Sequence, residues 1–161
     1  ECIGEKGTIR GIFLTQTHFD HLYGINWRVD LFPQCVVYTS EAGTEGMYSE
    51  KLNFSRYHDD PIVFKGDNVG VLHDGDRVEL FPGEYLTVLE TPGHDKSCLT
   101  YYTENVVFSG DSFIPGVKVI TTFPRSDKQE AVRSVEVISK VAEGRGIYPG
   151  HGDIVFGNVI F

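Results

Sequence analysis

Hydrophobic side chains in the first third of the chain form short runs that end in polar segments. Residues 9–15 are rich in β-branched and aromatic side chains, and residues 16–21 then turn polar and rich in histidine. This pattern predicts a buried strand that leads into a loop. Residues 35–39 (CVVYT) predict a second strand, and Ser40 can cap a short helix over residues 42–51, although two glycines weaken that prediction.

Residues 53–68 combine aromatic, proline and charged residues without a clear period, so we expect a long surface loop. Loops of this length in compact domains are often functional lids. Three aromatic residues in and beside this loop are open to two interpretations. They anchor the loop to the body of the protein, which is the commoner arrangement, or they line a pocket for an apolar acyl group. These residues are Tyr48, Phe54 and Tyr57.

The second half of the chain predicts a series of strands and then one helix. The strands cover residues 69–72, 77–80, 85–90, 98–103 and 106–109. Asp-Gly and Glu-Asn pairs at their connections predict hairpins. Ser126 followed by Gln129 predicts a capping box, after which apolar residues recur at helical spacing as far as Gly144. A last strand pair, residues 146–148 and 154–156, completes a mixed α and β (α+β) protein in which we expect most strands to be antiparallel.

Length and charge exclude several classes of protein. With 161 residues and 40% hydrophobic residues, we expect a single globular domain over residues 1–161. The formal net charge of -9 disfavours nucleic acid as a partner. No apolar run approaches the ~20 residues that a membrane span needs. The three cysteines form no C-x-x-C pair, so we expect neither a disulfide framework nor a thiolate zinc site.

Four of the six histidines lie where a predicted strand meets a loop. They are His18 and His21 in TQTHFDHLYG, His94 in TPGHDKS and His151 in YPGHGD, and the similar junction SGDS supplies Asp111. Side chains alternate along extended backbone, so Gln16, His18 and Asp20 should share one side. The glycines directly before His94, Asp111 and His151 would let the backbone pass close to a shared centre.

Imidazole and carboxylate groups together suit zinc and similar first-row divalent ions, and two such ions need about six to eight donors. The candidate donors are His18, Asp20, His21, His94, Asp111 and His151, with Gln16 a weaker candidate. A metal lowers the pKa of bound water toward ~7 and polarises a carbonyl or phosphoryl oxygen. The chemistry that this donor set indicates is hydrolysis.

The ordered landmarks HFDH, TPGH, SGDS and PGHGD resemble the metallo-β-lactamase superfamily of binuclear hydrolases, over residues 9 to about 155. The resemblance implies a four-layer αββα sandwich with the metal site at one edge between two sheets. It also implies two sets of ligands: His18, His94 and Asp111 for a first ion, and Asp20, His21, His151 and Asp111 for a second. A hydroxide between the ions would be the nucleophile, with Asp20 as the proton acceptor.

The sequence departs from the family pattern in two places. Gln16 replaces the first histidine of the H-x-H-x-D-H motif. Because an amide oxygen is a poorer zinc donor than imidazole, we expect a weakened first site, with either one tightly held ion or an asymmetric pair. Gln16 could equally be an amide that lies behind the ligands or faces the substrate. Only fifteen residues precede Gln16, fewer than the first strands of the family need, so we expect an absent segment, a covering chain or a remodelled layer, and hence self-association as a homo-oligomer.

Together these features predict a metal-dependent hydrolase that cleaves an ester, thioester or amide-type bond in a small molecule. We expect one or two zinc ions, with manganese or iron as alternatives, and neither nucleic acid nor membrane as a partner. Two other functions remain open: a phosphodiesterase or nuclease of the same superfamily, and a non-catalytic metal-binding or interaction protein of the same fold. We expect a cytoplasmic protein, unless a leader has been lost before Glu1.

Overall fold

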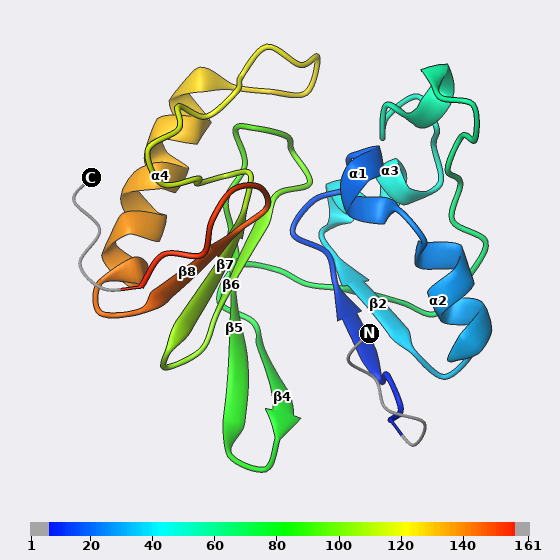
Figure 1. The fold of residues 1–161 in the computed structure, drawn as a ribbon, viewed down its shortest axis with the longest axis horizontal. Helices are drawn as coiled ribbons and strands as arrows, with labels where there is room; N and C mark the ends of the chain where they lie inside the picture. The colour runs from blue at the N-terminus through cyan, green and yellow to red at the C-terminus, as the bar shows by residue number, and fades with distance from the viewer. Residues whose placement is uncertain (1–6, 157–161) are drawn as a thin grey trace.

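The computed structural model describes residues 7–156 and shows two β-sheets packed face to face, with helices on both outer sides (Figure 1). The resulting order of layers is α, β, β, α, as the sequence resemblance implies. The elements in chain order are β1 (Gly11–Phe13), α1 (Phe19–Leu22), α2 (Ile25–Leu31), β2 (Val36–Thr39), α3 (Glu41–Met47), the 3-10 helix η1 (Ser55–Tyr57), β3 (Val69–Val71), β4 (Arg77–Phe81), β5 (Glu84–Glu90), β6 (Leu99–Tyr102), β7 (Val106–Gly110), α4 (Lys128–Ala142) and β8 (Gly146–Pro149).

The first sheet has the strand order β1-β2-β3, and both of its pairings are parallel. Its outer face is covered by α1, α2 and α3 (Figure 1). Leu22 of α1, Ile25 of α2 and Met47 of α3 pack with Val37 of β2 in one apolar cluster. Burial of these side chains holds the three short helices in place, since none of them is long enough to be stable alone.

The second sheet has the strand order β4-β5-β6-β7-β8. The first three pairings are antiparallel, and β7 pairs with β8 in parallel. Ile138 and Ala142 of α4 pack on Val107 and Ile147 of this sheet. A separate cluster joins the two sheets, with Val88 and Leu99 of the second sheet against Phe13 and Tyr38 of the first.

The expectation of mostly antiparallel strands is wrong, because three of the pairings between named strands are parallel. The strand at residues 69–72 does not form a hairpin with the strand that follows it. It pairs in parallel with β2, because the long connection through α3 and residues 53–68 carries the chain back to the starting end of the sheet. The turn at Asp74 and Gly75 then passes the chain from one sheet to the other, and Gly75 adopts a φ of 81° there.

The two predicted helix caps have different outcomes. Ser40 does cap α3, because its hydroxyl accepts a hydrogen bond from Gly43 N at 3.0 Å. The prediction that Ser126 caps α4 is wrong. The cap is Asp127, whose carboxylate accepts hydrogen bonds from the backbone N–H groups of Gln129 and Glu130. The Ser126 hydroxyl is already used, since it donates to the carbonyl oxygen of His94.

The last predicted strand pair is present as a single antiparallel bridge between Ile147 and Val155. Cys35 and Cys98 are free and buried, and Cys2 lies outside the described residues. No helix within residues 7–156 combines the length and apolar character needed to cross a bilayer.

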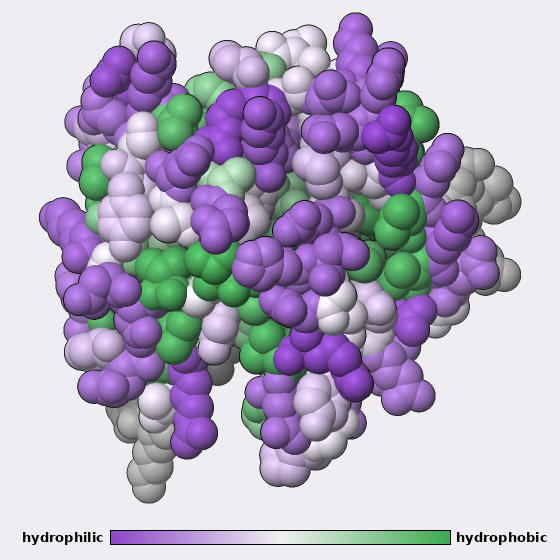
Figure 2. Space-filling view, turned by 180° about the vertical axis from the view of Figure 1, so that it is seen from behind, coloured by the Kyte–Doolittle hydropathy of each residue, from purple (hydrophilic) through white to green (hydrophobic). Residues whose placement is uncertain are grey.

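Large apolar side chains remain exposed at several places, among them Trp27, Phe81 and Phe156. On the face opposite to that of Figure 1, apolar groups gather across the middle and hydrophilic ones surround them (Figure 2). Such surface is compatible with self-association. Self-association stays a prediction, which light scattering at high protein concentration would test.

Candidate metal centre

The candidate ligands meet where the loops that follow β1, β5, β7 and β8 converge. β5 and β7 both run antiparallel to β6, and β8 runs parallel to β7, so the carboxyl ends of these three strands lie at one edge of the second sheet. His94, Asp111 and His151 follow them. The end of β1 is tied to the same place, because Leu99 N donates to Thr15 O at 2.8 Å.

Glycines make this convergence sterically feasible, as the sequence predicted. A Cβ on Gly110, which has a φ of 53°, would lie 2.7 Å from the side chain of Thr15. A Cβ on Gly150 would lie 2.2 Å from Asp111 Oδ1. A Cβ on Gly93 would lie 2.2 Å from the backbone nitrogen of Ala131 in α4. Any larger residue at these positions would push the ligand-bearing loops apart.

His18 and His94 form a buried part of the cluster, which we call the inner pair. The two residues are 5% and 4% exposed, and His18 Nδ1 lies 3.3 Å from His94 Nε2. His94 Nδ1 donates to the carbonyl oxygen of Ile120 at 2.9 Å, so its Nε2 keeps a free lone pair. Burial and the neighbouring His18 lower the pKa of His94 below its ordinary value, which favours the neutral, metal-binding form of the imidazole.

Asp20, His21 and His151 form a second part, which we call the outer group. One ligand atom from each lies within 4.8 Å of the others. The side chains of Asp20 and His151 are 37% and 57% exposed, whereas that of His21 is 12% exposed. His151 Nε2 donates to Asp20 Oδ2 at 3.1 Å. The outer group therefore offers one carboxylate and two imidazoles at the solvent side of the centre.

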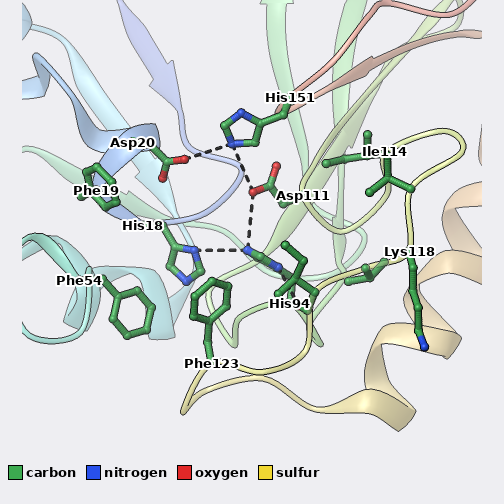
Figure 3. A pocket seen from close by; sticks show the side chains of 13 residues that line it. His18, Phe19, Asp20, Phe54, His94, Asp111, Ile114, Lys118, Phe123 and His151 are labelled. Atoms are coloured by element: carbon green, nitrogen blue, oxygen red, sulfur yellow. Dashed lines mark hydrogen bonds and ion pairs between the residues drawn. The ribbon is translucent and has the colours of Figure 1, made fainter.

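Asp111 stands between the inner pair and the outer group (Figure 3). Its Oδ2 lies 3.4 Å from His21 Nε2 and 3.6 Å from the Nε2 atoms of both His94 and His151. Burial acts to raise the pKa of Asp111, but the surrounding imidazoles outweigh it and hold the pKa below its ordinary value. The carboxylate is therefore ionised and within reach of both parts of the cluster.

Gln16 is fully buried and contacts the cluster from behind. Its amide nitrogen donates to Asp111 Oδ2 at 2.9 Å and to His21 Nε2 at 2.7 Å. Its amide oxygen faces away from them and accepts a hydrogen bond from the Cys98 thiol at 3.8 Å. Of the roles that the sequence left open, this orientation corresponds to an amide behind the ligands, and it does not face the substrate side.

Two charged residues behind the inner pair carried no clear signal in the sequence. Asp95 Oδ2 lies 3.6 Å from His18 Nε2 and 3.5 Å from Arg125 Nε. Burial acts to raise the pKa of Asp95, but His18, Ser97 and Arg125 together lower it to about 2. The carboxylate holds the His18 ring so that Nδ1 faces the centre. Asp95 could have been found, because it directly follows His94, whereas Arg125 lies in a segment without a recognisable motif.

A cavity of about 370 Å³ opens over the cluster (Figure 3). His18, His94, Asp111, Asp20 and His151 line its polar end, and the remaining lining is mainly apolar. Of the three aromatic residues at the long loop, Phe54 lines the cavity. Tyr48 donates from its hydroxyl to Gly66 O at 2.7 Å and so anchors the loop, and Tyr57 is 91% exposed.

The chemistry of the donor set fits a divalent cation. Four imidazoles and two carboxylates converge, and the ion pairs described for Asp111 involve only histidines. Asp111 Oδ1 is buried without a hydrogen-bond partner in the described part of the chain. Buried polar atoms of this kind are commonly satisfied by a bound ion or water. All six candidate ligands thus lie together in one cluster.

Comparisons with known proteins agree with this geometry. Residues 5–152 match the family model described as the metallo-beta-lactamase superfamily. A protein of Streptococcus pyogenes serotype M6 named "Probable metallo-hydrolase M6_Spy0554" is 28% identical over 149 residues, which cover 88% of this chain and 63% of that protein. The chain therefore spans less than two thirds of the length of this curated relative.

Two solved structures are similar over most of the chain. The BLEG-1 B3 metallo-beta-lactamase has a TM-score of 0.82 and 26% identity, with 91% of this chain and 71% of that chain covered. The protein TTHA1623, in a di-iron-bound form, has a TM-score of 0.74 and 25% identity over the same shares. From the family match, the shared fold and the converging donors, we conclude that this chain belongs to the metallo-beta-lactamase superfamily.

Proposed function

We propose that this protein is a metal-dependent hydrolase that cleaves an ester or thioester bond, or a related acyl bond, in a small molecule. The observation that carries the proposal is the convergence of four imidazoles and two carboxylates at one end of a cavity large enough for a small substrate. The name of the streptococcal relative supports the general class of metallo-hydrolase. The formal net charge of -9 disfavours the nuclease alternative.

Zinc is the metal we propose, because imidazole and carboxylate donors without thiolate suit it, and iron or manganese would use the same donors. Asp20, His21 and His151, with Asp111, would hold one ion, and His18 and His94, with Asp111, would hold another. His21 would then exchange its contact with the Gln16 amide for the ion. When bound, the metal would lower the pKa of water and polarise the substrate carbonyl group.

The chain's own residues would orient the substrate and move a proton. Asp20 is half-exposed at the mouth of the cavity, and its Oδ2 is the atom that we propose accepts the proton from the attacking water. His151 Nε2 lies 3.1 Å from the same oxygen, and by binding the ion it would leave that oxygen free to accept the proton. His94 and His18 are held by Ile120 O and Asp95, which keeps both imidazoles in place while a substrate enters.

A substrate panel tests the proposal. Purified protein would be assayed with and without added zinc, manganese or iron(II), on p-nitrophenyl esters, acyl thioesters, lactones, a β-lactam and bis-p-nitrophenyl phosphate. We expect metal-dependent turnover of at least one carboxylic acyl substrate and none of the phosphodiester. Turnover confined to the phosphodiester would favour the nuclease alternative. Bound metal without turnover of any substrate would favour the non-catalytic function.

A further inference from the structure

The cavity over the metal centre has a largely apolar wall. Phe54 forms one side, and the other side comes from the segment that precedes α4. The apolar residues of that segment that line the cavity are Ile114, Val117, Val119, Ile120 and Phe123. The polar groups gather at the opposite end, at the metal centre (Figure 3). A ligand in this cavity therefore meets hydrocarbon along most of its length and polar atoms at one end.

The backbone around Phe54 fixes the position of its side chain. Its φ of 63° is in the left-handed region, which a bulky residue seldom adopts. The buried side chain of Asn53 holds this conformation, because its amide accepts from Ser55 N at 2.9 Å and donates to Ile62 O at 2.8 Å. The Phe54 ring consequently packs 5.3 Å from the ring of Phe123, measured between centroids.

These two phenylalanines enclose the inner pair. The ring of His18 lies 4.9 Å from that of Phe54 and 5.1 Å from that of Phe123, and the ring of His94 lies 5.4 Å from that of Phe123. The outer group, by contrast, opens to solvent at Asp20 and His151. The cavity therefore has a closed apolar side and an open polar side.

Charged groups along the wall are scarce. Within the described residues, Lys118 is the only lysine or arginine that lines the cavity. It is exposed, and in Figure 3 its amino group points away from the imidazoles and carboxylates. A carboxylate or phosphate on the part of the substrate that enters the apolar side would therefore find no partner there. The wall suits an uncharged hydrocarbon chain.

We propose that the cavity selects substrates by an apolar acyl chain, which lies against the wall formed by Phe54, Phe123 and the segment before α4 while the scissile carbonyl group meets the metal centre. The proposal rests on the proposed hydrolase function. Water adds to the acyl carbon, the bond from that carbon to the leaving oxygen or sulfur breaks, and the leaving group takes a proton. The leaving group departs on the open side at Asp20 and His151, so the acyl chain is the part that stays on the closed side. At roughly 30 Å³ for each small group, a cavity of about 370 Å³ has room for about twelve groups. That is enough for an acyl chain of about four to eight carbons together with the scissile carbonyl group and the leaving atom.

Two ester series test whether the cavity recognises the acyl part or the alcohol part of the substrate. In the first, the acyl chain of p-nitrophenyl esters is lengthened from acetyl to dodecanoyl, and in the second, the alcohol of acetate esters is lengthened from methyl to octyl. Each rate is divided by the rate of alkaline hydrolysis of the same ester. We expect kcat/KM to rise about fourfold for each acyl methylene until the cavity is filled, and to stay level along the alcohol series. A level acyl series, or a rise along the alcohol series, would overturn the proposal.

A pair of variants in the same loop gives the matched control. Phe54→Ala should reduce the rise with acyl chain length to less than half, because it removes one side of the closed part. Tyr57→Ala should leave the rise unchanged, because Tyr57 is 91% exposed and does not line the cavity. Metal content and melting temperature of both variants would show that the comparison is between folded, loaded proteins. An equal effect of both substitutions, or of neither, would contradict the proposal.

A binding measurement separates this proposal from the hydrolase function itself. The non-hydrolysable ketones 2-nonanone and acetone would be titrated calorimetrically into protein without added metal. We expect 2-nonanone to bind, acetone to give no measurable binding, and Phe54→Ala to weaken the binding of 2-nonanone at least tenfold. Ketone binding without turnover of any acyl substrate would disprove the hydrolase function but would still support binding of an apolar chain in the cavity. If acyl substrates are turned over but kcat/KM does not rise with acyl chain length and 2-nonanone does not bind, selection by the acyl chain would be disproved and the hydrolase function would not.

Discussion

The inner pair and the outer group of the metal centre differ in exposure, in donors and in neighbours. The inner pair consists of two buried imidazoles under aromatic rings, and the place of a third histidine is taken by Gln16. The outer group has two imidazoles and a carboxylate, and two of its three members are exposed. On the proposed function, we expect the outer group to hold metal more tightly and to meet water, and the inner pair to border the substrate.

Gln16 accounts for much of this difference. A histidine in its place would point a lone pair at the cluster, whereas the Gln16 amide points N–H groups at Asp111 and His21. N–H groups interact with the carboxylate much as a cation would, but they cannot bind a metal. The Gln16 amide thus satisfies Asp111 with a hydrogen bond, where a histidine would offer a lone pair to a metal ion.

The largest effect should come from the carboxylate that both parts share. We predict that Asp111→Asn lowers kcat/KM more than a hundredfold and releases the bound metal, because the amide keeps the shape of the side chain but loses its charge. Metal per protein after dialysis and initial rates would be measured together. Asp153→Asn, at an exposed position two residues after His151, is the control and should change neither. Retained activity in Asp111→Asn would exclude a shared carboxylate.

Metal stoichiometry tests the difference between the two parts directly. We predict one tightly held ion per chain in the natural sequence and two in Gln16→His, because the imidazole would give the inner pair its missing donor. Elemental analysis after dialysis against a weak chelator gives the stoichiometry. Two equally tight ions in the natural sequence would show that the two parts are equivalent.

We expect a smaller effect on metal affinity from Asp95, which supports His18 of the inner pair. Asp95→Asn should weaken binding of the second ion to Gln16→His by about 10- to 100-fold, because the carboxylate no longer orients His18. The tightly held ion of the outer group should be unaffected. Competition with a coloured chelator measures both affinities. Equal losses at the two ions would mean that Asp95 acts through general stability.

We expect the smallest effect from Asn53, which holds Phe54 in the wall of the cavity. Asn53→Ala should lower the free energy of unfolding by about 2 kcal/mol, because Ser55 N and Ile62 O would be left without their buried partner. Asn26 makes a similar pair of hydrogen bonds, to Val63 O and Lys65 N, at an exposed place. Asn26→Ala should cost less than half as much, since water can replace it. Urea unfolding of the two variants makes the comparison, and equal losses would contradict it.

Much of the local structure could be predicted from the sequence. The strands at residues 9–15 and 35–39 and the long helix before Gly144 are present, because side-chain periodicity and caps act over a few residues. The partner of β3 and the cap of α4 could not be predicted. Each depends on contacts between distant segments: β3 on the long connection that brings it to β2, and the cap on the use of Ser126 by His94.

The same division applies to the metal centre. The sequence by itself determined the candidate ligands and the family, because each ligand lies in a short motif at a strand end, and a glycine directly precedes His94, Asp111 and His151. Only the tertiary structure decided that the Gln16 amide faces Asp111, that Asp95 and Arg125 support His18, and that Phe54 meets Phe123. These contacts join residues that lie 30 to 95 positions apart and share no motif. The physical reason is that the packing of the two sheets, which no local pattern encodes, sets which side chains meet.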